Sequence, residues 1–437
     1  MNTQTSEKLV ARLWQCQPAS SVTDDGQQFR TIYPGRASHS RGCDFKDAVF
    51  TLNGQMISGD VEIHVKSSQW YSHGHHRDPK YNNVVLHVAW WHDNQSPTRL
   101  QNGKTVPTIC LSTFPGYPAD ELNQHLELCG NSSISCPEAE KHLNADNLGK
   151  LLTLAGEKRF TAKAALFRQA LRKEEAEQVL LRSIARALGY AQNAEPCEEL
   201  ANRLSLNSLQ NDKPESTRQA LILGTAGLLP SQRHRPVEDM ETDKLEMIWQ
   251  SMSLTETMNE ADWCFSQVRP DNFPTRRLIA LSYLLTRHRQ RGLLRGILQL
   301  ARKAPSGAEH RWLENGLVIA GPDYWRNHCD FGVAKKRSSA LLGREKASEI
   351  VINAILPFAY VWAEISSDLK LKRKAAEIYR RYPSRADNEL TRHMKQQLLL
   401  KPNARLSACQ QQGLLHIFKT YCRFRNCTAC LLGSNRS

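Results

Sequence analysis

The chain has 437 residues, a formal net charge of +14 and 23% charged residues. At roughly 100–200 residues per domain, this length predicts two or three domains. No stretch reaches the ~20 consecutive apolar residues of a membrane span, and the first residues lack the apolar segment of a secretory signal. Composition therefore disfavours membrane, secreted and disordered proteins, and we expect a cytoplasmic protein.

The positive charge is concentrated late in the chain. Residues 370–437 hold 15 Lys and Arg against 3 Asp and Glu, whereas residues 1–100 hold 10 against 9. A solvated, highly soluble tail has the same composition. A focused basic region also attracts the phosphate backbone without reading sequence. We therefore expect a nucleic-acid partner, with DNA favoured over RNA, and no membrane partner.

The first 115 residues carry the pattern of an α/β sheet domain. Residues 5–16 predict an amphipathic helix with Ser6 as its cap. Short β-rich runs follow, separated by turn residues. Asn53-Gly54 lies between two alternating runs, and this dipeptide favours a type I′ hairpin because both central positions need positive φ.

The rest of the chain changes character in two steps. Residues 116–150 are rich in Pro, Gly, Asn and Ser and predict a linker or long loop. Residues 151–400 have helical periodicity, including one long run over 162–187 that ends before Gly189. Residues 401–437 form a basic, Cys-rich C-terminus. The fold class that follows is α+β, with a sheet domain followed by a mostly α-helical domain.

Polar side chains occupy one face of the predicted strand at 60–66. Side chains alternate along a strand, so Glu62, His64 and Lys66 share a face with Asp60, while valine and isoleucine occupy the other. Asp44 precedes the neighbouring strand. A polar sheet edge with incidental charges would show this mixture too, but packing does not require it.

This arrangement resembles the core of the PD-(D/E)XK nucleases. The resemblance implies that Asp44 and Glu62 bind Mg²⁺ (or Mn²⁺) together with the backbone carbonyl of Ile63. His64 stands where that family has Lys, which is a serious departure. Either His64 acts as a neutral base towards the attacking water, or Lys66 reaches in from two residues on.

A histidine-rich stretch follows directly. Six of the 15 histidines lie between residues 64 and 92. Their spacing follows no familiar zinc motif. We therefore expect His76, Asp78 and Tyr81 to line the mouth of the cleft and contact substrate, and His87 to project from the next strand.

Several stretches along the chain carry a second resemblance: 59–64, 70–81, 85–88, 159–160, 187–193 and 269–277. With these stretches, nearly the whole chain is similar to an uncharacterised bacterial family of unknown function, DUF2851. The resemblance implies a shared architecture and no activity.

The stretch 269–277 combines arginines with a rigid turn. Pro270 and Pro274 stiffen the loop, and Thr275 is placed to cap a helix beginning near Arg276. Arg269 and Arg277 beside a helix N-terminus are candidates for a phosphate contact, although a purely structural turn between helices is the favoured interpretation.

Four of the twelve cysteines crowd into the C-terminus. Their spacing predicts a metal site, because four thiolates suit tetrahedral Zn²⁺ or a [4Fe–4S] cluster. In helicase–nuclease and CRISPR-adaptation nucleases with such a cluster, one Cys lies far upstream, so another cysteine could replace the first. Buried free thiols or a redox pair are the alternative. Arg423 and Arg425 lie inside this cluster and are expected to contact nucleic acid. The four cysteines are Cys409, Cys422, Cys427 and Cys430.

Together these features favour a metal-dependent nuclease that hydrolyses phosphodiester bonds of DNA or RNA. Two other functions fit the sequence. One is a non-catalytic nucleic-acid-binding protein with a degenerate nuclease site. The other is a helical scaffold for protein partners, whose binding would depend little on salt.

Overall fold

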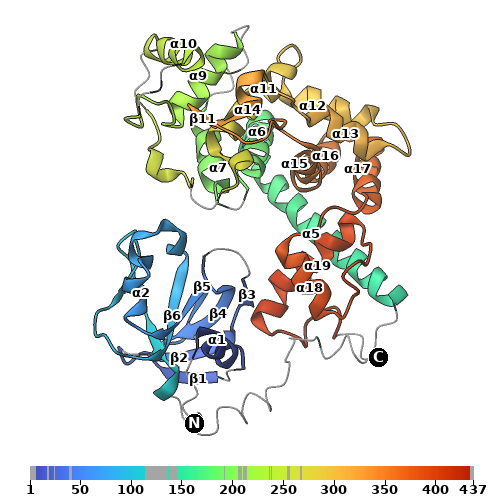
Figure 1. The fold of residues 1–437 in the computed structure, drawn as a ribbon. Coiled ribbons are helices and arrows are strands. Elements are labelled where there is room, and N and C mark those ends of the chain that lie inside the picture. Colours follow the sequence, from blue (N-terminus) through green and yellow to red (C-terminus); the bar gives the residue numbers. More distant parts are fainter. Residues whose placement is uncertain are drawn as a thin grey trace. The chain divides into compact units, whose positions relative to one another are not determined.

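The fold was derived from a computed structural model, shown in Figure 1, which contains two compact units. The first unit comprises Met1–Ala155, Asp387–Ala404 and Gln412–Ser437, and the second comprises Gly156–Ala386 and Arg405–Gln411. The structure describes residues 6–16, 19–23, 25–38, 42–113, 136, 145–190, 192–204, 209, 214–235, 237, 239–252, 256–265 and 268–433. Most of the predicted linker at 116–150 lies outside these residues.

The first unit is built on a mixed sheet with the strand order β1-β2-β4-β5-β6-β9, and β3 pairs with β4. The pairs from β1 to β5 are antiparallel, whereas β5–β6 and β6–β9 are parallel. The strands are β1 (Ala19–Val22), β2 (Gln28–Tyr33), β3 (Arg36–Ala37), β4 (Phe45–Leu52), β5 (Gln55–Lys66), β6 (Val84–Trp91) and β9 (Thr108–Cys110). A separate small pair joins β7 (Thr98–Arg99) to β8 (Thr105–Val106).

The hairpin between β4 and β5 forms as its turn residues predict. Asn53 and Gly54 have φ values of 48° and 81°, and Leu52 pairs with Gln55 across the turn. The positive φ at both positions is the type I′ requirement that Asn-Gly meets at low cost. This local prediction is confirmed.

The apolar face of the sheet is covered by α1 (Glu7–Cys16), as Figure 1 shows. Val10, Leu13 and Trp14 of the helix pack into one buried cluster with side chains such as Val61 and Ile63 of β5. The predicted leading helix and the predicted apolar face of this strand are therefore confirmed. The opposite face carries the even-numbered residues of β5.

That opposite face is covered by the crossover between the parallel strands β5 and β6. The crossover contains α2 (Gln69–Ser72) and the short 3₁₀ helices η1 (His75–Arg77) and η2 (Pro79–Tyr81). Trp70 and Tyr81 anchor it in a second small core with Cys43 and Val84. A parallel pair needs such a connection because the chain has to return to the same end of the sheet.

The C-terminal segments of the first unit pack beside β2 and β3. Arg36 forms an ion pair of 2.8 Å with Glu389 of α18 (Glu389–Gln397). The Tyr33 ring lies 5.8 Å from that of Phe418 in α19 (Ala408–Thr420), measured between centroids. The short helix η7 (Cys422–Phe424) follows.

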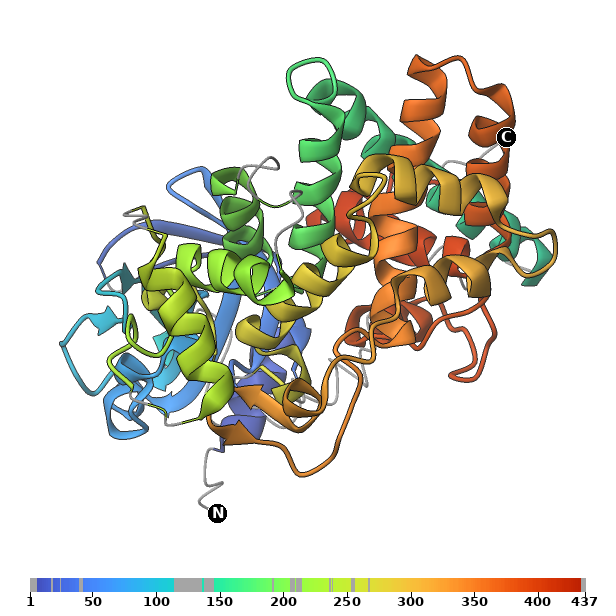
Figure 2. The same ribbon diagram turned by 90° about the horizontal axis from the view of Figure 1, so that it is seen from above.

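The second unit is helical, with one small hairpin of β10 (His328–Asp330) and β11 (Val333–Ala334). Its helices surround one large apolar core and are seen from above in Figure 2. The helices are α5 (Ala145–Ala170, entering from the first unit), α6 (Ala176–Leu188), α7 (Ala194–Arg203), α9 (Glu215–Thr225), α10 (Met240–Gln250), α11 (Pro274–Arg287), α12 (Leu293–Lys303), α13 (Glu309–Leu317), α14 (Asp323–Asn327), α15 (Arg344–Ile350), η6 (Val351–Ile355, a π-helix), α16 (Leu356–Ile365) and α17 (Leu369–Arg381).

One helical segment, Arg344–Ile365, is long and apolar enough to cross a membrane by length and composition. Of its most apolar window, 67% is buried inside the structure. Its apolar side chains join the large core of the second unit.

Two local predictions differ from the structure. The long run over 162–187 is broken by turns at 171–174, where Arg, Lys and Glu occupy consecutive positions, so that α5 and α6 are separate helices. The second concerns Thr275, which does not cap a helix. The helix α11 begins at Pro274 with Phe273 as its cap residue, and the Thr275 hydroxyl donates to Asp330 instead.

Candidate metal centre

Asp44 and Glu62 are held side by side by reciprocal hydrogen bonds to the backbone. The N–H of Ile63 donates to Asp44 Oδ2 at 3.0 Å, and the N–H of Asp44 donates to Glu62 Oε2 at 3.2 Å. Asp44 immediately precedes β4, and Glu62 lies on the adjacent β5. Antiparallel pairing of β4 with β5 therefore brings together the two carboxylates that the sequence singled out.

Both carboxyl groups are costly to ionise where they lie. Burial, with the charge of Asp44 as the next cause, raises the pKa of Glu62 to about 9. Burial raises the pKa of Asp44 to about 6. A bound cation would reverse this cost, because it stabilises the anionic form of both groups.

Three imidazoles converge beside Glu62. The ligand nitrogens of His64, His73 and His75 all lie within 4.8 Å of one another. Glu62 Oε1 lies 3.4 Å from His75 Nε2 and 3.9 Å from His64 Nε2. The buried His75 Nε2 makes no hydrogen bond within the part of the chain that is described. This ring nitrogen is therefore available to bind a metal ion.

Outer contacts fix the orientation of the two buried rings. His64 Nδ1 lies 2.9 Å from His87 Nε2, and His87 Nδ1 lies 2.9 Å from the hydroxyl of Thr98. The Tyr81 ring packs on His75 with 3.9 Å between centroids. Such outer partners set the tautomer and direction of a metal-binding imidazole.

The buried imidazoles are neutral, which is the form that binds metal. Burial, followed by the neighbouring His87 and His75, lowers the pKa of His64 to about 2. Burial followed by His73 lowers the pKa of His75 to about 4. Three imidazole nitrogens and one carboxylate suit Zn²⁺, Mn²⁺ or Fe²⁺ better than Mg²⁺, which prefers oxygen ligands and water.

The other predicted residues of this region lie around the cluster. His76 packs on Tyr71 and accepts a hydrogen bond from Arg77. Asp78 caps η2 by accepting from the N–H of Lys80, and Lys66 is exposed at the end of β5. Among the predicted substrate residues here, Tyr81 is the one packed on a cluster histidine.

Sequence reasoning did not single out His73 and His75. Both lie in the crossover, which folds back over the polar face of β5. The signal that could have found them is the density of histidines in a segment connecting two parallel strands, since that segment has to cover the sheet. The ligand spacing alone gives no such indication.

The two arginines that the sequence singles out in 269–277 lie in different surroundings. Arg277 donates to the carbonyl of Leu341, to the Tyr190 hydroxyl and to Asn272 Oδ1. Arg269 is exposed at the residue before η5 (Pro270–Asn272). The interior side chain of Arg277 thus ties segments of the second unit together.

The C-terminal cysteines divide between the two units. Cys409 is fully buried in the second unit. Cys422, Cys427 and Cys430 belong to the first unit. Arg423 lies over the ring of Phe424 at 4.5 Å, and Arg425 is exposed with a left-handed φ of 49°.

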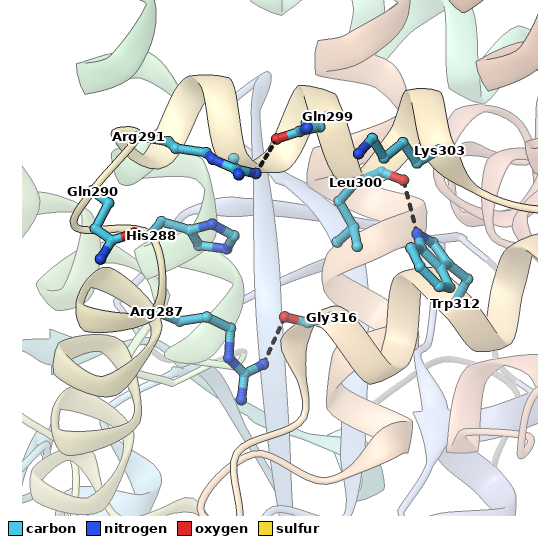
Figure 3. Close-up of a pocket in the computed structure, with 10 residues that line it drawn as sticks. Arg287, His288, Gln290, Arg291, Gln299, Leu300, Lys303, Trp312 and Gly316 are labelled. Atoms are coloured by element: carbon cyan, nitrogen blue, oxygen red, sulfur yellow. Dashed lines mark hydrogen bonds between the residues drawn. The ribbon is translucent and has the colours of Figure 1, made fainter.

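A basic pocket of about 320 Å³ lies in the second unit among the end of α11, α12 and the helix α13. Figure 3 shows His288 and Leu300 on facing sides, with Trp312 beside Leu300. Arg287, Arg291 and Lys303 also line it. Arg287 donates to the carbonyl of Gly316, and Arg291 donates to Gln299, so these guanidiniums are held in place and keep further N–H groups.

The chain belongs to the family described as "Protein of unknown function (DUF2851)", whose family model matches residues 7–388. No curated protein and no solved structure matches the chain. Family membership thus agrees with the sequence resemblance, and the identity of the sheet as a PD-(D/E)XK core stays a prediction.

Proposed function

We propose that this protein is a cytoplasmic metal-dependent phosphodiesterase that cleaves nucleic acid, DNA in preference to RNA. The observation that carries the proposal is the convergence of His64, His73 and His75 on Glu62, with Asp44 locked beside it. Three imidazoles, two of them buried, beside two largely buried carboxyl groups exceed what packing of a sheet requires.

The order of elements supports a nuclease-like interpretation of the sheet. A helix precedes the antiparallel β4–β5 pair, and a crossover leads to β6, which is parallel to β5. In the PD-(D/E)XK resemblance, Asp44 just before β4 and Glu62 on β5 would be the two acidic metal ligands. The histidines replace the lysine of that pattern and shift the expected metal from Mg²⁺ towards Mn²⁺ or Zn²⁺.

The chemistry follows from the ligand set. A divalent ion here would polarise a phosphodiester oxygen and lower the pKa of a bound water. His64, His73, His75 and Glu62 would hold it. Asp44, held beside Glu62, would accept a proton from the attacking water. His87 keeps the His64 ring in one orientation through its 2.9 Å contact.

Nucleic acid as the substrate is supported by charge. The basic pocket of the second unit combines cations with Trp312, which is 43% exposed. Exposed aromatic rings and arginines are what single-stranded nucleic acid stacks on. A strongly positive net charge adds attraction to phosphate.

The test is metal binding and cleavage by the full-length protein. We expect Mn²⁺ or Zn²⁺ to bind at about one ion per chain at this centre and to support cleavage within a panel of single- and double-stranded DNA and RNA. His75→Ala should abolish both. His76→Ala is the matched control for metal binding, since His76 is the next residue and packs on Tyr71, and it should retain the bound ion.

Each other outcome has a defined meaning. Metal binding without cleavage of any nucleic acid would favour the binding-only alternative. Loss of the metal in His76→Ala but not in His75→Ala would overturn the assignment of ligands. A protein that binds no divalent ion at this centre would overturn the proposal.

A further inference from the structure

We propose that the basic pocket of the second unit binds one nucleotide that carries a phosphate monoester, either the phosphorylated end of a strand or a free nucleoside monophosphate. The inference rests on the proposed function in one respect, the expectation that this protein acts on nucleic acid. The pocket has a volume of about 320 Å³. This is the lower end of the ~300–1,000 Å³ typical of small-molecule sites, which suits a single nucleotide rather than a longer stretch.

One face of α12 forms a side of the pocket. The lining residues of this helix are spaced three and four apart, which places them on the same face. Arg291 precedes the helix and donates to Gln299, so its guanidinium is held along that face, as Figure 3 shows. The face therefore presents polar and apolar groups side by side. Its lining residues are Gly296, Gln299, Leu300 and Lys303.

Two helical glycines make room for the side chains of the pocket wall. A side chain on Gly296 would meet His288 Nδ1 at 2.1 Å. One on Gly316 would meet Leu300 Cδ2 at 2.4 Å. Glycine within a helix is destabilising relative to alanine, so this arrangement costs helix stability. The buried His288 Nε2 makes no hydrogen bond within the described residues, and a polar occupant of the pocket would supply a partner.

The charged side chains of the lining are all basic. Arg287, Arg291 and Lys303 line the pocket, and none of the ten lining residues drawn in Figure 3 is acidic. Within the described part of the chain, none of these three cations forms an ion pair with a carboxylate. An internal phosphodiester carries one negative charge, whereas a phosphate monoester carries about −1.5 to −2 near pH 7. The uncompensated positive charge therefore favours the monoester.

Trp312 of α13 supplies a surface on which a base can stack. Its indole N–H donates to the carbonyl of Leu300 at 3.1 Å, which fixes the ring at the pocket. The residue nevertheless stays 43% exposed. Every base has a π-face that can stack on such a ring, so we expect little preference among bases. The base would contact Trp312 and Leu300, and the phosphate would contact the cations of the lining.

The test measures binding to the full-length protein in the presence of a chelator, which prevents metal-dependent cleavage. Fluorescence anisotropy compares a short single-stranded DNA that has hydroxyls at both ends with the same strand phosphorylated at its 5′ or its 3′ end. We expect a phosphate at one of these ends to lower the Kd by about tenfold or more. Deoxyadenosine monophosphate should displace the strand, whereas deoxyadenosine and inorganic phosphate at the same concentration should not.

Two pairs of variants assign the binding to the pocket. Lys303→Gln should remove most of the effect of the end phosphate. Arg289→Gln is its matched control, because it removes the same charge from an exposed residue outside the lining, and it should retain the effect. Trp312→Ala should weaken binding of deoxyadenosine monophosphate by about 5- to 150-fold, the range for loss of one stacking contact. Trp91→Ala, at a tryptophan of the first unit that is 50% exposed, should not.

The outcomes separate this inference from the proposed function. Equal affinities for all three strands, with no displacement by deoxyadenosine monophosphate, would overturn the inference and leave the proposed cleavage standing. Equal strand affinities with displacement would identify a free nucleotide as the ligand. Loss of the phosphate effect in Arg289→Gln but not in Lys303→Gln would overturn the assignment to the pocket. A protein that prefers the phosphorylated end but cuts no nucleic acid with any metal would support the pocket and overturn the proposed function.

Discussion

Glu62 links Asp44 to the histidines of the candidate metal centre. It contacts His75 through one oxygen and accepts the Asp44 N–H through the other, while only 5% of its surface is exposed. A carboxylate buried in this way costs stability unless a cation faces it. Removing the charge of Glu62 should therefore weaken metal binding. The same change should leave the free energy of unfolding of the metal-free protein the same or higher.

The first residue-scale prediction is a Glu62→Gln variant. Glutamine keeps the shape and can still accept from Asp44, but it cannot ionise. We expect Mn²⁺ or Zn²⁺ affinity to fall by more than the ~10–100-fold typical of losing an outer partner of a ligand. The metal-free protein should melt at the same temperature or higher. Calorimetric titration and thermal melts check this, and a metal-free variant that melts well below the unmodified protein would contradict it.

Lys346 of α15 carries a second buried charge, in the second unit. Its Nζ lies 3.0 Å from Glu349 Oε2 and 3.2 Å from the centre of the Tyr190 ring. Burial lowers its pKa to about 8, although the Glu349 charge opposes the shift. The folded protein therefore releases this proton at a lower pH than the unfolded chain does.

This gives a prediction with a definite sign. Between about pH 8 and the usual lysine pKa of 10.5, the unfolded state binds more protons, so the contribution of Lys346 to stability rises with pH. The cost of the buried charge is fully present below pH 8. Lys346→Met removes this dependence. The unfolding free energy of the unmodified protein minus that of the variant should increase from about pH 7.5 to about pH 9.5, by at most about 1.4 kcal/mol per pH unit. If the unfolding free energies of the two proteins, measured in urea, change with pH in the same way, the pKa of Lys346 is not lowered.

Only some residues of the candidate metal centre could be predicted from the sequence. Asp44 and Glu62 could be predicted to meet because strand alternation and one hairpin determine their positions. His73 and His75 could not, since their approach to Glu62 depends on how the crossover folds over the sheet. Periodicity predicts which face a strand residue occupies but does not predict which loop covers that face.

At the scale of elements, the close packing of β5 and β6 depends on Gly59. A side chain there would meet Val85 Cγ1 at 2.5 Å and the Asn83 carbonyl at 2.9 Å. The parallel pairing of Glu62 with His87 begins just beyond this point. A residue that pushed the strands apart would therefore displace the histidine centre as well.

We expect Gly59→Ala to lower the unfolding free energy by about 1–3 kcal/mol, the usual range for overpacking, and to weaken metal binding. Gly343→Ala is the control, because a side chain at Gly343 meets nothing within 4 Å and its φ is negative. It should cost less than ~1 kcal/mol. Equal effects of the two substitutions in denaturant titrations would contradict the packing argument.

Elements differ in how well local sequence predicts them. The β4–β5 hairpin follows from two turn residues, and α1 follows from its apolar spacing. The break between α5 and α6 has no glycine or proline to mark it, so the helical pattern continues through it. The start of α11 at Pro274 shows the same limit, since Thr275 is engaged by Asp330, a partner far along the chain.

For the whole molecule, the sequence shows where charge lies but not which segments meet. The basic C-terminal region contributes α18 and η7 to the first unit and α17 to the second. Contacts such as Arg36–Glu389 join residues hundreds of positions apart and leave no periodic signal. The cysteine spacing likewise groups Cys409 with Cys422, Cys427 and Cys430, whereas Cys409 is buried in the second unit and the other three belong to the first.

The last prediction concerns nucleic-acid binding through the basic pocket of the second unit. Removing one phosphate-binding cation should reduce the slope of log K against log salt by about 0.9 for double-stranded DNA and about 0.7 for single strands. An Arg291→Glu, Lys303→Glu double variant should therefore bind more weakly and reduce the slope by about twice that amount.

Lys8→Glu with Lys104→Glu makes the same change in net charge at exposed positions of the first unit. If the pocket binds phosphate, this control should shift affinity less and leave the slope nearly unchanged. Equal slopes in the two double variants would show that net charge alone attracts the nucleic acid, and an affinity insensitive to salt would favour an apolar protein partner instead.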